Sequence, residues 1–222
     1  MERLNEGIHQ FLEEIKNDDI LADSVEIAIV TFNTVAGTAL AFSTIENIEG
    51  MIITAGNTAG DTPKGVEKAL ELLENEKNFL KANGKRYNQP WIVIMSDGRA
   101  TASYNKETGT KDQEDVNKRL LIAQKKIKDL ESEHRLTVIP VLISEISDGD
   151  HSEAKLQMQG FTNSNRCIEI YDSASQAAFK NFFKILCRSV SVSNADLSFA
   201  DTVVNTACDS EARTSDDKKN GF

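Results

Sequence analysis

The chain has little of several residue types, and each shortage excludes a class of protein. Its 222 residues include only three cysteines, three prolines and one tryptophan. No apolar run approaches the roughly 18 residues that span a bilayer, and the first residues lack the basic and apolar segments of a secretory signal. We therefore expect a cytoplasmic protein that does not enter a membrane.

The cysteines are too far apart to form a metal or redox centre. Cys167, Cys187 and Cys208 include no Cys-x-x-Cys pair, which argues against a zinc site. Cys167 falls in an apolar strand and Cys187 in a helix, so both are expected to be packing residues. The histidines, at positions 9, 134 and 151, also lack the spacing of metal ligands.

Positive charge is scarce and scattered. The formal net charge is -10, and Lys and Arg alternate with acids rather than forming a basic block. Binding to nucleic acid or to an anionic membrane is therefore not expected. The chain also lacks a phosphate-binding Gly-x-x-x-x-Gly-Lys-Ser/Thr loop, a Gly-x-Gly-x-x-Gly turn and a Gly-x-Ser-x-Gly elbow, which removes the usual support for nucleotide-dependent and hydrolase functions.

What the sequence does have is an alternation of helices and apolar strands. Helical spacing is expected near residues 4–15, 62–82, 116–130, 152–159 and 174–190, and strands near 24–33, 37–43, 91–96, 136–143 and 166–171. The first two strands are close enough for a hairpin, and Pro140 predicts a bulge in its strand. The pattern predicts one α/β domain over residues 1–192, with a doubly wound, mostly parallel sheet and helices on both faces, followed by a disordered polar tail over 193–222.

A candidate site follows from two segments of this pattern. The apolar strand Trp91–Ser96 ends in Asp97-Gly98, which brings one carboxylate to the rim of the sheet, where α/β folds bind ligands. Earlier, the loop 60–63 (Gly-Asp-Thr-Pro) opens a helix, with Thr62 as the expected N-cap and the proline as the first helical residue. Asp61 could assist a cation beside Thr62 or simply favour the helix N-terminus, and we expect the second role. A hydroxyl and a carboxylate on one rim are half of a site for a hard cation.

This order of elements resembles a von Willebrand factor type A domain, most of all the intracellular bacterial ones of the tellurite-resistance type. The resemblance rests on the early hairpin, the Gly-x-Thr-Pro loop and the strand that ends in Ser-Asp-Gly. It implies a metal-ion-dependent adhesion site in which Thr62 and Asp97 are ligands of Mg²⁺, or of Mn²⁺ or Ca²⁺. The family's first motif, Asp-x-Ser-x-Ser after a central first strand, has no counterpart in this sequence.

The absent motif lowers the expected affinity for metal. Mg²⁺ takes about six oxygen ligands, and Thr62 and Asp97 supply two, so we expect a weak or absent site. The absent strand would lie in the middle of the sheet, and its loss either makes its neighbours pair directly or leaves two unpaired edges. Three explanations stay open: a true start further upstream, a degenerate relative of the family, or a strand supplied by another chain.

The resemblance implies a non-enzymatic protein-interaction module rather than an enzyme. A partner would bind at the sheet rim and complete the metal coordination with its own carboxylate, and the loops 99–111 and 148–150 would shape the contact. By analogy of fold, the module would serve a bacterial stress or metal-resistance complex. The alternatives are a metal-dependent hydrolase or phosphatase that uses the same rim, and a degenerate domain without a metal site.

Overall fold

A three-stranded parallel sheet lies at the centre of the structure, a computed structural model that describes residues 2–48, 52–53, 60–97, 99–102, 104–105, 110–144, 152–171 and 181–186. Its strands are β3 (Trp91–Ser96), β6 (Thr137–Ser144) and β7 (Ile168–Tyr171), in the order β3-β6-β7. Because they are parallel, all three end at the same edge of the sheet. Asp97 directly follows the end of β3, so it lies at that edge.

The central strand β6 contains Pro140 without the bulge that the sequence predicted. Pro140 pairs with Ile94 in a register that runs unbroken from Trp91 to Ser96. The ladder between β6 and β7 begins only at Val141. Pro140 therefore has no partner in β7, and its missing N–H does not interrupt that ladder.

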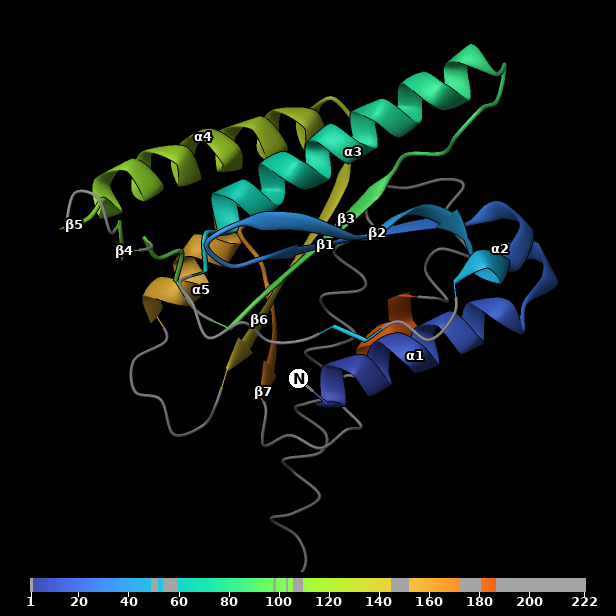
Figure 1. Cartoon of the computed structure of the whole chain (residues 1–222), viewed down its shortest axis with the longest axis horizontal. Helices are drawn as coiled ribbons and strands as arrows, with labels where there is room; N and C mark the ends of the chain where they lie inside the picture. The colour runs from blue at the N-terminus through green and yellow to red at the C-terminus, as the bar shows by residue number, and fades with distance from the viewer. Residues whose placement is uncertain are drawn as a thin grey trace, which may run out of the picture.

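Helices cover both faces of this sheet (Figure 1). Alternate strand residues point to opposite faces. One set packs against α3 (Thr62–Ala82), α4 (Gln113–Ser132) and α5 (Ser152–Gln159) and includes Ile94, Val138 and Leu142. The other set packs against α1 (Glu2–Lys16) and the helical residues 181–186, and includes Ile139, Val141 and Ile170. The predicted α/β arrangement with helices on both faces is confirmed for these strands.

The predicted hairpin is also present, but it is a separate sheet. β1 (Glu26–Phe32) and β2 (Ala36–Thr44) pair in antiparallel fashion. In the described part of the chain no ladder joins β1 to β3, so the single doubly wound sheet that the sequence predicted is not formed there. The sequence left two outcomes open for the absent strand, direct pairing of its neighbours or two unpaired edges, and the described residues show no direct pairing.

The hairpin is instead held by α3. A Cβ placed on Gly65, in the first turns of α3, would lie 2.5 Å from Cδ1 of Phe32. Such an approach of helix to strand leaves no room for a side chain, so Gly65 fixes how closely the hairpin and α3 pack.

Shorter elements differ from the sequence prediction. α2 (Asp19–Ser24) and the 3-10 turn η1 (Ile45–Asn47) were not predicted, because six and three residues are too few to show a helical period. The expected exposed loop 99–111 contains one pair of short antiparallel strands, β4 (Tyr104–Asn105) and β5 (Thr110–Lys111).

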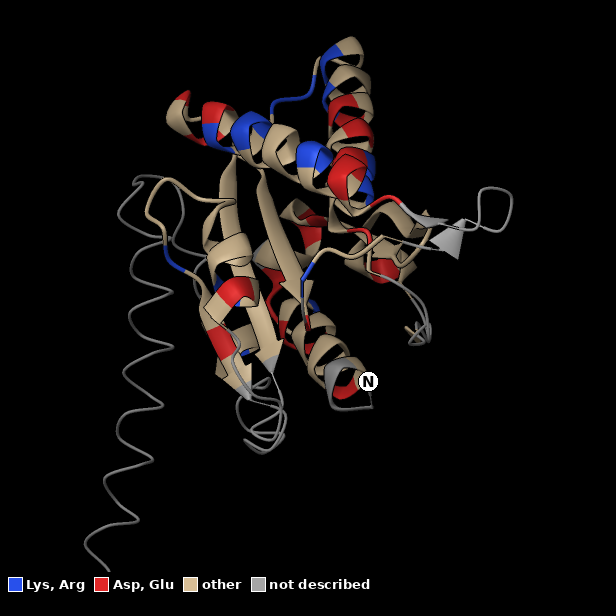
Figure 2. Ribbon diagram, turned by 90° about the vertical axis from the view of Figure 1, so that its left-hand side faces the viewer, with Lys and Arg blue, Asp and Glu red and all other residues tan. Residues whose placement is uncertain are grey.

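Acidic and basic side chains are mixed on the helices, as the sequence predicted. Acidic and basic residues alternate along α3 and α4, the two long helices at the top of Figure 2. No helix among the described residues is both long and apolar enough to cross a bilayer. The expected tail 193–222, together with Cys187, Cys208 and the acids 148 and 150, lies outside the described residues.

Candidate functional site

Two hydrogen bonds join the loop that carries Thr62 to the loop that follows Asp97. The backbone N–H of Gly60 donates to Oγ1 of Thr101 at 3.1 Å, and the N–H of Thr101 donates to the carbonyl of Gly60 at 3.0 Å. Thr62 lies two residues after Gly60, and Asp97 lies four residues before Thr101. The structure therefore brings the two predicted site segments to the same rim.

Glutamine side chains from two helices fix the second of these loops. Gln157 of α5 accepts a hydrogen bond from the N–H of Ala100 at 2.9 Å. Gln113 of α4 accepts from the N–H of Ala102 and donates to the carbonyl of Ala100, each at 2.9 Å. Ala100 and Ala102 are both buried. The loop is thus held by its backbone, and its position does not depend on a bound ligand.

The N-cap of α3 is Asp61, which corrects the prediction of Thr62. The carboxylate of Asp61 accepts the N–H of Lys64 at 3.2 Å. Thr62 is the first helical residue, and Pro63 the second. Asp and Thr both serve as N-caps, and the carboxylate has the further advantage of a favourable interaction with the helix dipole.

Asp61 is also the centre of a buried ion network. Nη1 and Nη2 of Arg119 donate to its two carboxylate oxygens, each at 2.8 Å, and Nζ of Lys64 lies 3.0 Å from Oδ2. Asp61 is 2% exposed. Burial by itself raises the pKa of the Asp61 carboxyl, but the hydrogen bonds from Arg119 and Lys64 outweigh it and hold that pKa below its usual range. The same bond to Asp61 raises the pKa of Arg119.

Asp61 has a structural role in this network. Its charge is met by two cations, and Arg119 also binds Asp115 at 2.8 Å. The cations therefore keep Asp61 from adding a carboxylate ligand beside Thr62. Arg119 was not predicted from the sequence, because it lies 58 residues from Asp61 and sits on the polar face of α4 without any local signal.

The network reaches the hairpin turn as well. The N–H of Asp61 donates to the carbonyl of Asn33 at 2.9 Å, and Nζ of Lys64 donates to the carbonyl of Thr34 at 3.1 Å. The turn between β1 and β2 is thus fixed beside the start of α3. At its tip Val35 is 70% exposed, so an apolar side chain projects from this rim.

Thr62 is buried, and its hydroxyl has no partner among the residues that the structure describes. The residue is 3% exposed, and its N–H donates to the carbonyl of Gly60 at 3.1 Å. No hydrogen bond reaches its Oγ1 from any residue that the structure describes. An unsatisfied buried hydroxyl costs about 1–3 kcal/mol.

Asp97 is exposed and carries an uncommitted carboxylate. Neither an ion pair nor a hydrogen bond involves it within the described ranges. The nearby Arg99 is paired with Glu153 instead. The oxygens of Thr62 and Asp97 are of the type that Mg²⁺ prefers, but they are two where about six are needed. In the same described ranges, no cluster of three His, Cys, Asp or Glu side chains could hold a metal alone.

Comparisons with known proteins bear on the fold only. No protein-family model matches the chain, and no curated protein does. Two structures of proximal thread matrix protein 1 from the mussel byssus are similar, with TM-scores of 0.51 and 0.50 and sequence identities of 16% and 14%. Each match covers 84% of this chain but only 42% and 43% of the mussel chain, less than half its length. This likeness is one of fold, in agreement with the α/β arrangement described above.

Proposed function

We propose that the chain is a non-enzymatic interaction module of the von Willebrand factor type A kind. In this proposal a protein partner binds at the rim formed by the hairpin turn, the start of α3 and the loop after β3. A divalent cation is held by Thr62 and Asp97, and a carboxylate of the partner completes its coordination. A place in a metal- or tellurite-stress complex belongs to the proposal by family resemblance.

The buried hydroxyl of Thr62 carries the proposal. It is unsatisfied, and it lies on a loop that is hydrogen-bonded to the loop of the uncommitted Asp97. A purely structural threonine at a helix start would be expected to bond to a neighbouring backbone group, as Asp61 does. A cation at Thr62 and Asp97 supplies the partner that this hydroxyl lacks.

The charges near Thr62 and Asp97 favour a cation site whose coordination is completed by a protein partner. With Asp61 bound to Arg119 and Lys64, Asp97 is the carboxylate proposed to hold the cation. A divalent cation held by one carboxylate keeps half of its positive charge, so it attracts a second carboxylate from outside. The exposed Val35 on the same rim offers an apolar contact beside the charge.

The test is binding of short peptides that carry one Glu or Asp, compared with the same peptides carrying Gln or Asn. Fluorescence anisotropy is measured in Mg²⁺ and again in EDTA. The expected result is binding of the acidic peptides that needs Mg²⁺ and is lost in the variant Asp97→Asn. Glu67→Gln is the matched control, because Glu67 is an exposed acid further along α3 and the change removes the same charge. Peptide binding that survives EDTA, or that Glu67→Gln weakens equally, contradicts the proposal.

A further inference from the structure

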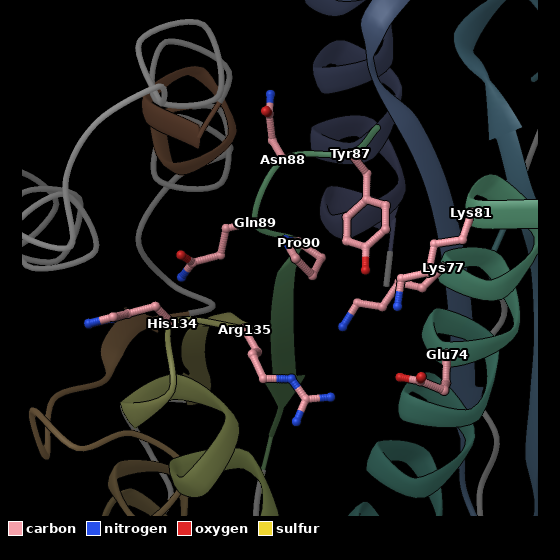
Figure 3. Close-up of a pocket in the computed structure, with 9 residues that line it drawn as sticks. All are labelled: Glu74, Lys77, Lys81, Tyr87, Asn88, Gln89, Pro90, His134 and Arg135. Atoms are coloured by element: carbon pink, nitrogen blue, oxygen red, sulfur yellow. The ribbon is translucent and has the colours of Figure 1, made fainter. Parts of the chain in front are cut away.

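A second polar cleft lies at the opposite end of the strands. It has a volume of about 270 Å³ and is lined by Glu74, Lys77, Lys81, Tyr87, Asn88, Gln89, Pro90, His134 and Arg135 (Figure 3). Pro90 immediately precedes β3, and Arg135 comes two residues before β6. The cleft therefore opens at the N-terminal ends of the strands, away from the rim of Thr62 and Asp97.

Lys77 is the unusual residue of this cleft. It follows Val66, Leu70 and Leu73 at helical spacing, so it occupies a place in the apolar stripe of α3. Lys77 is only 7% exposed, yet its ammonium group has no ion pair or hydrogen bond with the described residues. A buried charge without a partner is strongly unfavourable. The side chain points into the cleft, where an anion would meet it (Figure 3).

The other lining residues add to the positive charge. Lys77, Lys81 and Arg135 face a single acid, Glu74, and Figure 3 shows all four side chains directed toward the same space. Arg135 also pairs with Glu133 at 3.0 Å, but both side chains are more than half exposed, so that pair contributes little. A positive cleft is notable in a chain whose net charge is -10.

The C-terminus of α3 accounts for Lys81, which lies in its last turn, but not for Lys77. Basic residues favour the C-terminus of a helix, where the last carbonyls lack partners. In α3 those carbonyls are already bonded, because Asn83, Gly84 and Lys85 donate their N–H groups to Phe79, Leu80 and Lys81. Lys77 is therefore not needed as a cap.

The walls of the cleft are fixed by hydrogen bonds. Gly84 ends α3 at a φ of +68° and turns the chain back toward the sheet. The N–H of Thr137 donates to the carbonyl of Pro90 at 2.9 Å, and the amide of Gln89 donates to Oγ1 of Thr137 at 2.9 Å. The N–H of Arg135 donates to Leu130 at 2.9 Å. The cleft is thus formed before any ligand enters it.

We propose that this cleft binds a small phosphate-bearing ligand. A phosphate monoester carries a charge of about −1.5 to −2 at pH 7, which matches the excess of two positive side chains among the lining residues. A single carboxylate would neutralise one of them. Arg135 provides a planar set of donors suited to phosphate oxygens, and Lys77 and Lys81 bind as point charges. The volume lies just below the usual range for ligand pockets, about 300–1,000 Å³, so the ligand is small.

The proposal is tested by calorimetric titration of the whole chain with inorganic phosphate, with glycerol 3-phosphate and with acetate. Saturable binding of one phosphate per chain is expected, with acetate at least about tenfold weaker. The variant Lys77→Met is expected to weaken phosphate binding at least about tenfold, since it removes a charge-assisted hydrogen bond. Tighter binding of the ester than of inorganic phosphate identifies an organic ligand, and the reverse identifies the free ion.

Matched variants separate lost binding from lost folding. Glu74→Gln removes the acid of the cleft and should strengthen phosphate binding, which no misfolded variant would do. Lys77→Met should leave thermal stability unchanged or raised, because it replaces an unpartnered buried ammonium by an apolar chain of similar length. Lys125→Met, on the exposed face of α4, is the charge control. Absence of phosphate binding in the unmodified chain, or equal binding by Lys77→Met and Lys125→Met, overturns the proposal. Asp97→Asn should not affect it, so the two sites are tested separately.

Discussion

Replacing Asp61 by Asn should destabilise the domain by about 2–3 kcal/mol. Asn keeps the N-cap, because its side-chain oxygen can still accept the N–H of Lys64. It loses the negative charge, which leaves Arg119 and Lys64 without their buried counter-ion. Breaking a fully buried ion pair costs about 3–5 kcal/mol. The side chain of Arg119 is 23% exposed, so water compensates part of that loss.

The assay is urea unfolding of the unmodified chain and of Asp61→Asn, with the slope against urea checked for constancy. In the double variant Asp61→Asn with Arg119→Met, the guanidinium is also removed. We expect the double variant to be more stable than Asp61→Asn alone, because in the single variant the mostly buried guanidinium keeps only the exposed Asp115 as its counter-ion. A loss below about 0.5 kcal/mol in Asp61→Asn would refute the buried network as a stabilising feature.

The contribution of Asp61 to folding stability should depend on pH. The pKa of Asp61 is lower in the folded state than in the unfolded state, where it is about 3.9. Its contribution to stability is therefore complete above the unfolded value and is lost as the pH falls through the folded value. The difference between the unmodified chain and Asp61→Asn should be constant from about pH 5 to pH 7 and shrink below about pH 4. A difference that stays constant down to about pH 2 contradicts the assigned pKa direction.

Three further substitutions follow from the packing and the caps. Gly65→Ala should lower the free energy of unfolding by about 1–2 kcal/mol, measured by urea unfolding, because the cost of overpacking against Phe32 exceeds the gain in helix propensity. An increase in stability would show that the ring of Phe32 can move to accommodate the methyl group. Asp112→Ala should cost about 1 kcal/mol in the same assay, because Asp112 caps α4 through the N–H of Asp115; the control Asp112→Asn should cost little. Thr62→Val should stabilise the metal-free protein by up to about 1 kcal/mol in EDTA, since it removes an unsatisfied buried hydroxyl, and a loss of stability would reveal a protein partner for that hydroxyl.

The elements of the domain could be predicted because their signals are local. Continuous apolar residues in 91–96 and 137–143 identify buried parallel strands, and the spacing of Val66, Leu70 and Leu73 identifies α3. The sequence lacks a strand for the middle of the sheet, but it did not decide whether the neighbouring strands would pair directly or stay apart, as they do among the described residues. The position of the hairpin relative to the three-stranded sheet depends on tertiary packing, such as the contact between Gly65 and Phe32.

The candidate site could be predicted only in part. Thr62 and Asp97 were identified from motifs, but the cap was assigned to Thr62 because adjacent Asp and Thr are both good N-caps. Arg119, which is remote in sequence and binds Asp61, favours Asp61 over Thr62 as the N-cap of α3. The polar cleft at the N-terminal ends of the strands had one signal in the sequence, Lys77 in the apolar stripe of α3. That signal becomes informative only once the burial of the side chain is known.

The most direct test of the proposed function is Mn²⁺ titration of the metal-free chain, followed by electron paramagnetic resonance, without and with acetate. We expect one weak site, with a dissociation constant near the millimolar range, that acetate strengthens. Binding should be lost in Asp97→Asn and in Thr62→Val, retained in Thr62→Ser, and unchanged in Glu67→Gln. Failure to bind Mn²⁺ at about 10 mM in the presence of acetate, or equal binding by Asp97→Asn and Glu67→Gln, would contradict a cation held by Thr62 and Asp97.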